Sequence, residues 1–81
     1  QIVKIYPNPA TEIVNVKIDE PSFVPDFINI LTLTGKIIYT NIIEPDNRLL
    51  QIPVNFKKGI YLIQMGKGSI TMFSQKLVVA N

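Results

Sequence analysis

Glu12-Ile13-Val14-Asn15-Val16-Lys17-Ile18 is the stretch that decides the fold class of this chain. In an extended conformation, Val14, Val16 and Ile18 share one face, whereas Asn15 and Lys17 lie on the opposite face. A period of two is typical of a β-strand with one buried face. The stretch therefore predicts a strand that packs on a core.

Other strand-like segments precede and follow this stretch, and residues typical of turns separate them. They comprise residues 2–6, 27–33, 36–43, 50–54, 60–65 and 70–79. Thr34-Gly35 is typical of a tight hairpin in which Gly35 supplies a positive φ. Both strands of that hairpin carry apolar residues on both faces, so we expect it to be central. The sequence does not show which face of this hairpin points toward the core.

Seven short strands at this spacing, with no helical period, predict an all-β fold. An immunoglobulin-like two-sheet β-sandwich fits best, with an aliphatic core because the Cys-Trp-Cys core is absent. The 81 residues correspond to a single domain, residues 1–81. Gln1 opens directly into a strand-like run and is not Met, so we expect this domain to be excised from a longer secreted protein.

The side-chain chemistry argues against an enzyme. The chain has no His and no Cys, which removes the commonest general base and the usual ligands of zinc. Asp19, Glu20 and Asp26 could share a cation if their loops converge. Turns prefer acidic residues, however, so solvated turn positions are the favoured interpretation. We therefore expect no catalytic residue, no metal and no cofactor.

The charge pattern argues against nucleic-acid binding. The net charge is +2, and the eight basic residues are scattered, with only Lys57 and Lys58 adjacent. A nucleic-acid binder more often shows a clustered basic stripe. The apolar runs are shorter than the ~20 residues of a membrane-spanning helix. Among the tyrosines, core packing is favoured for Tyr61, whereas the environment of Tyr39 is left open.

Five short motifs follow one another along the chain in a specific order. They are Tyr6-Pro7-Asn8-Pro9-Ala10, Val14-Asn15-Val16, Leu33-Thr34-Gly35-Lys36, Gly59-Ile60-Tyr61-Leu62-Ile63 and Lys76-Leu77-Val78-Val79. Each is common alone, but their order, spacing and position near the end of the chain are specific. Together they resemble the type A C-terminal sorting domain of the type IX (Por) secretion system of Bacteroidetes. The resemblance covers essentially the whole chain.

The resemblance implies a secretion and sorting signal for an upstream cargo. The cargo would pass through the periplasm, and the outer-membrane type IX translocon would recognise the domain. A sortase-like protease would then remove it, leaving the cargo at the cell surface or secreted. Carried over by motif, the translocon recognition residues are Gly59, Tyr61, Lys76, Leu77, Val78 and Val79. The residues whose motifs shape the fold are Pro7, Asn8, Pro9 and Gly35.

The last predicted strand, residues 70–79, is expected at a sheet edge. There its unpaired N–H and C=O groups would be offered to a receptor strand. If Leu77 and Val79 point into the core together with Phe73, then Lys76 and Val78 point outward. Lys76 has a second interpretation, as an edge lysine that opposes aggregation.

Two alternatives stay open. The chain could be a structural or adhesive module of a surface protein, binding protein or glycan through its loops and Tyr39. Its high apolar content also allows a homodimer formed by edge-strand pairing, which could accompany either function.

Overall fold

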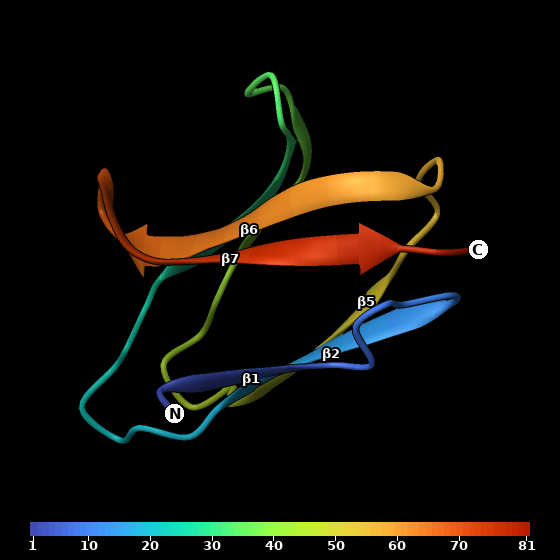
Figure 1. The fold of residues 1–81 in the computed structure, drawn as a ribbon. Helices are drawn as coiled ribbons and strands as arrows, with labels where there is room; N and C mark the ends of the chain where they lie inside the picture. The colour runs from blue at the N-terminus through green and yellow to red at the C-terminus, as the bar shows by residue number, and fades with distance from the viewer.

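A computed structural model describes residues 1–81 as seven antiparallel strands in two sheets. The smaller sheet has the order β1-β2-β5, and the larger has the order β4-β3-β6-β7. Figure 1 shows the two layers, with β6 and β7 in one and β1, β2 and β5 in the other. The predicted all-β sandwich and its strand segments are confirmed. The bounds are β1 Val3–Tyr6, β2 Ile13–Ile18, β3 Phe27–Thr32, β4 Ile37–Ile42, β5 Leu49–Pro53, β6 Gly59–Lys67 and β7 Ile70–Val79.

The core lies between the sheets and is almost wholly aliphatic. The predicted inward face of β2 is confirmed, because Val14, Val16 and Ile18 are all buried. No polar or charged residue is buried with them. The larger sheet contributes buried residues from β3, β6 and β7, namely Ile28, Ile30, Tyr61, Ile63, Met65, Leu77 and Val79. Burial of this apolar surface is what holds a chain without disulfides in one fold.

The position of β4 differs from one expectation. In a constant-type immunoglobulin domain the fourth strand joins the first, second and fifth. Here β4 pairs with β3, from Phe27↔Ile42 to Leu31↔Ile37, and has no neighbour on its other side. The expectation that both strands of this hairpin are central is therefore right for β3 and wrong for β4. The expectation was based on apolar residues on both faces of β4. Two of these residues, Ile37 and Ile42, are exposed.

Two glycines set the hairpins of the larger sheet. Gly35 has a φ of +95° in the β3–β4 turn, which confirms the predicted positive φ. Gly66 lies at a β-bulge where the register of β6 against β7 shifts. A Cβ atom there would lie 1.9 Å from the carbonyl oxygen of Ile70. Only glycine therefore fits this close approach of the two strands.

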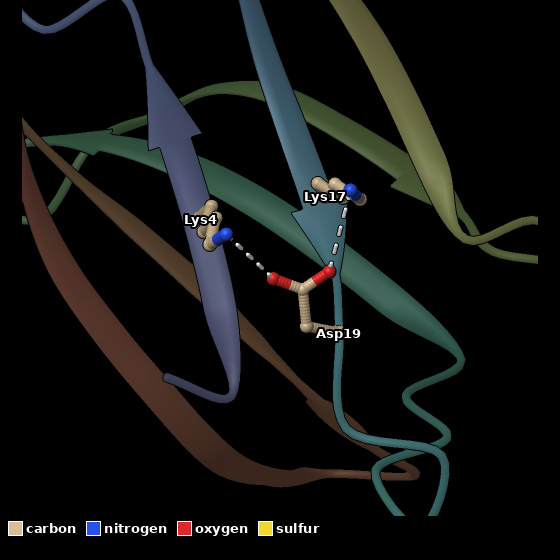
Figure 2. A network of polar contacts seen from close by, with 3 residues as sticks. All are labelled: Lys4, Lys17 and Asp19. Atoms are coloured by element: carbon tan, nitrogen blue, oxygen red, sulfur yellow. Dashed lines mark ion pairs between the residues drawn. The ribbon is translucent and has the colours of Figure 1, made fainter.

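An acidic side chain links the first two strands on the outside of the smaller sheet. Lys4 and Lys17 are cross-strand partners, an arrangement that like charges destabilise. Asp19 lies between them, with its carboxylate oxygens 3.6 Å from Nζ of Lys4 and 3.7 Å from Nζ of Lys17 (Figure 2). The carboxylate thus relieves the repulsion between the two ammonium groups.

Candidate functional site

β7 is an edge strand whose side chains alternate between the core and the solvent. It pairs with β6 along its length and has no other strand as a neighbour. Leu77 and Val79 are buried, Lys76 is exposed and Val78 is half-buried. The predicted edge position is confirmed, and so is the predicted outward direction of Lys76 and Val78. This strand is the centre of the candidate site.

The loop between β1 and β2 covers the outer edge of β7. The side chain of Asn8 carries both interactions that a neighbouring strand would make: Oδ1 accepts from the N–H of Val78 at 2.9 Å, and Nδ2 donates to the carbonyl of Lys76 at 3.1 Å. The prolines on either side of Asn8 have no N–H to offer, so its amide side chain takes the place of the backbone. The peptide bonds before Pro7 and Pro9 are both cis.

Ala10 forms the next backbone contacts along the edge of β7. Its N–H donates to the carbonyl of Val78 at 2.8 Å, and its carbonyl accepts from the N–H of Ala80 at 2.8 Å. Ala10 and Val79 thereby form a parallel bridge. Ala10 itself is fully buried. We call residues 7–10 the edge-capping loop, because they close the border of β7 from Lys76 onward.

The edge-capping loop changes what β7 can offer to a receptor. The sequence predicts unpaired N–H and C=O groups along this border, but those from the carbonyl of Lys76 to the N–H of Ala80 are already bonded. That part of the expectation is wrong. Its cause is a contact between positions about seventy residues apart, which no local pattern reveals. Strand addition at this end would have to displace Asn8 and Ala10.

The two motifs near the end of the chain lie side by side. Gly59 of β6 pairs with Val79 of β7, and Tyr61 pairs with Leu77. Tyr61 is buried, as predicted, and its hydroxyl donates to the carbonyl of Lys57. Its ring packs on Phe56 with a centroid distance of 5.6 Å. The fold thus brings the motif residues of β6 and β7 together with the edge-capping loop, whereas Gly35 shapes the separate β3–β4 hairpin.

The carboxylates considered for a cation each have a different protein partner. Asp19 pairs with two lysines, and the carboxylate of Asp26 accepts from the N–H of Gly68 at 3.1 Å. Glu20 accepts from the N–H and the hydroxyl of Ser22, and this lowers the pKa of its carboxyl group. No group of acidic side chains could hold a metal ion, and the surface has no pocket.

The comparison with known families decides what these motifs mean. The model of the family described as "Secretion system C-terminal sorting domain" matches residues 4–80. The chain belongs to this family, the sorting domains of type IX secretion. No curated protein and no solved structure matches it. The matched range includes every motif on which the resemblance depends, from Tyr6 to Val79.

Membership establishes the coarse function. This sorting domain is a signal for type IX secretion, which leads to the outer membrane or the cell surface. Its family is a sorting-signal family and not a catalytic one. The structure contains no helix able to cross a membrane.

Asn8 makes a contact that sequence reasoning does not identify. The resemblance places Asn8 among the residues that shape the fold, and in the structure its side chain forms hydrogen bonds with the backbone of β7. A weak sign was present, because Asn8 is the one residue of Pro7-Asn8-Pro9 whose side chain forms hydrogen bonds. Nothing in the sequence said which strand it would meet.

Proposed function

We propose that the outer-membrane type IX translocon recognises this sorting domain through the surface around Lys76 and Val78, and that a sortase-like protease removes the domain after passage through the periplasm. The observation that carries this proposal is the placement of these two residues. They lie on a strand that is hydrogen-bonded on both sides, yet Lys76 is exposed and Val78 is half-exposed.

The other recognition residues contribute from inside the fold. Tyr61, Leu77 and Val79 are buried, and Gly59 is half-buried beside Val79. Their role in recognition is to hold β6 and β7 in place, so that the outward side chains have one arrangement before binding. Such preorganisation lowers the ordering cost that association would otherwise carry.

Recognition of side chains is favoured over strand addition. Strand addition needs a free border, and the edge-capping loop occupies that of β7 from Lys76 onward. Lys76 supplies a charge that can be tested separately from the fold, because it makes no ion pair within the domain.

The adhesive alternative gains little from the geometry. A glycan-binding site usually offers an aromatic face, but the ring of Tyr39 is half-buried and packs against the core. No cavity accompanies it. We therefore propose the sorting signal alone.

A fusion experiment tests the proposal. A signal peptide and a reporter are placed before residues 1–81 in a bacterium with this secretion system, and the reporter at the surface or in the medium is measured. We expect export to fall for Lys76→Glu and Val78→Asp, whereas Thr71→Glu, an exposed change at the other end of β7, leaves it unchanged.

Deletion of residues 76–81 provides the second arm, and it should abolish export. Equal export with and without these residues would refute the translocon proposal. Removal by the protease is followed separately, as the loss of the domain from the exported reporter. A reporter that reaches the surface with the whole domain still attached contradicts that step.

A further inference from the structure

The outer face of the larger sheet carries an apolar patch that no motif predicted. Cross-strand partners share a face, and the register places Ile37, Leu31, Leu62 and Lys76 in one row across all four strands. The next row contains Ile60 and Val78, which are partners in β6 and β7. We call the apolar members of these rows the outer patch: Leu31, Ile37, Ile60, Leu62 and Val78.

Burial confirms that the outer patch faces away from the core. Ile30 and Ile63, the neighbours of Leu31 and Leu62 along the chain, are completely buried and occupy the opposite face. Ile37 is 52% exposed and Ile60 is 46% exposed. Leu31, Leu62 and Val78 are half-buried, but they are not among the partly buried residues that pack on the core. Large apolar side chains from four strands thus meet on one exposed surface.

The charges around this surface have one sign. Residues 27–42 and 57–81, which build the larger sheet, contain five lysines and no Asp or Glu. The rest of the chain contains three basic residues and all six acidic ones. Four of the five lysines lie at the end of the sheet that carries the outer patch, namely Lys36, Lys57, Lys58 and Lys76. None of them makes an ion pair.

The lysines of the larger sheet are scattered along the sequence, and no acidic residue lies within the segments that build this sheet. The acidic residues lie in β1–β2 and β4–β5 connections and beside the smaller sheet, and Asp26 lies before β3 at the opposite end of the larger sheet. An apolar centre with unpaired lysines around it is complementary to an apolar protein surface with carboxylates around it.

We infer that the outer patch and its lysines form the docking surface of this sorting domain for a protein whose complementary surface is apolar and rimmed by carboxylates. The inference rests on the proposed recognition through Lys76 and Val78, and it extends that contact across β6 and β3 to β4. The partner contacts one face of the larger sheet. That face exists only when β4, β3, β6 and β7 have paired.

A protein fits this surface better than a lipid bilayer does. Interfacial binding to lipid places apolar groups about 5–10 Å below the headgroup level. The side chains of the outer patch lie side by side on a sheet and partly cover one another, so that three of the five are only half-exposed. A flat partner covers such a face, whereas insertion into acyl chains needs protruding groups.

The test uses pairs of substitutions at the two ends of the same sheet. In the reporter fusion, Ile37→Asp with Ile60→Asp removes the apolar centre, and Ile42→Asp is the control, because Ile42 is 76% exposed at the opposite end. Lys36→Glu with Lys76→Glu reverses the charge, and Lys67→Glu in the β6–β7 hairpin is its control. Lys36→Arg with Lys76→Arg keeps the charge. Circular dichroism of each purified 81-residue variant verifies the fold.

We expect both patch double variants to lower export by about tenfold or more, as loss of central interface contacts does. The controls and the arginine variant should stay within about twofold of the parent, as peripheral changes do. If the folded Ile37→Asp, Ile60→Asp variant is exported normally, while Lys76→Glu and the deletion of residues 76–81 lower export, this inference is overturned and the proposed function stands. Export that survives the deletion overturns both.

Lipid binding is the remaining arm. The purified chain is sedimented with vesicles of phosphatidylglycerol and, separately, of phosphatidylcholine. We expect no sedimentation that depends on Ile37 and Ile60. Binding to phosphatidylglycerol vesicles that disappears in the Ile37→Asp, Ile60→Asp variant would identify the face as a lipid surface and overturn the inference.

Discussion

The side-chain oxygen of Asn8 accepts a hydrogen bond from the backbone N–H of Val78 at 2.9 Å, across 70 positions of sequence. The same side chain donates to the carbonyl of Lys76. One amide therefore behaves as a short strand and closes the border of β7. Edge strands with free backbone groups are prone to unwanted pairing, and this contact removes two such groups.

Replacing Asn8 by Ala should destabilise the fold by about 1–2 kcal/mol, because both hydrogen bonds are lost. Urea denaturation of the purified chain measures the change. Hydrogen exchange at the N–H of Val78 should also accelerate. Asn55→Ala is the matched control, since Asn55 is exposed and its side chain forms no hydrogen bond within the chain. Equal stability of the two variants would show that the Asn8 contact contributes nothing.

Tyr61→Phe removes only the hydroxyl that donates to the carbonyl of Lys57. The ring and its packing on Phe56 remain, so the expected cost is about 1 kcal/mol. Thermal denaturation compares this variant with Tyr6→Phe, because residue Tyr6 is 44% exposed. A Tyr61→Phe domain as stable as the parent would contradict the structural role assigned to the hydroxyl.

Gly66→Ala should be the most damaging small substitution in the chain. Its Cβ would collide with the backbone oxygen of Ile70, which cannot rotate away, so we expect a loss of about 3 kcal/mol or more. Gly68→Ala offers the comparison, because open space surrounds it and only its φ of +61° is unfavourable. That variant should lose about 1 kcal/mol. A reversed order in denaturation would mean that the bulge relaxes.

The stability of the domain should depend on the protonation of Glu20. Its carboxylate accepts from the backbone N–H of Ser22, and secondly from the Ser22 hydroxyl, so the pKa of the folded state lies below the ordinary value. A lowered pKa stabilises the folded state above the pKa of the unfolded chain, about 4.3 for glutamate, and this contribution is lost as the pH falls through the folded value. Glu20→Gln should therefore flatten the loss of stability on acidification.

The measurement is denaturation of the parent and the Glu20→Gln variant between neutral pH and about pH 3, where the linked proton is taken up. Ser22→Ala, which removes the second hydrogen bond, should have a smaller effect in the same direction. If the parent and Glu20→Gln lose stability in parallel, the hydrogen bonds from Ser22 do not favour the charged carboxylate.

Homodimerisation by edge-strand pairing stays a prediction. β4 is an edge strand with Ile42 76% exposed, so two copies could join along it. Sedimentation at several protein concentrations should then show a mass that rises toward twice that of the chain. A mass that stays at one chain throughout rules the dimer out.

Local patterns predicted the strands because apolar residues alternate with polar ones along a strand that has one buried face. The alternation from Val14 to Ile18 gave the inward face of β2, and the turn at Gly35 gave a hairpin. The position of β4 could not be derived in this way, because a strand with apolar residues on both faces is compatible with a central or an edge place. Its neighbours are decided by the whole sheet.

The candidate site was only partly predictable, for the same reason. The outward direction of Lys76 and Val78 follows from the period of two, but the contact with Asn8 joins distant parts of the chain. The sequence also did not show that lysines gather at one end of the larger sheet. Lysines that look scattered in sequence come together only when β4, β3, β6 and β7 are known to form one sheet.

The hydrogen bonds between the edge-capping loop and β7 make the border of β7 depend on complete folding of the domain. The last strand acquires its finished border only after a segment from the other end of the chain has arrived. A sorting domain that is only partly folded therefore presents β7 without this border. If the translocon recognises β7 as proposed, we expect it to export cargo whose sorting domain has finished folding in preference to cargo whose domain has not.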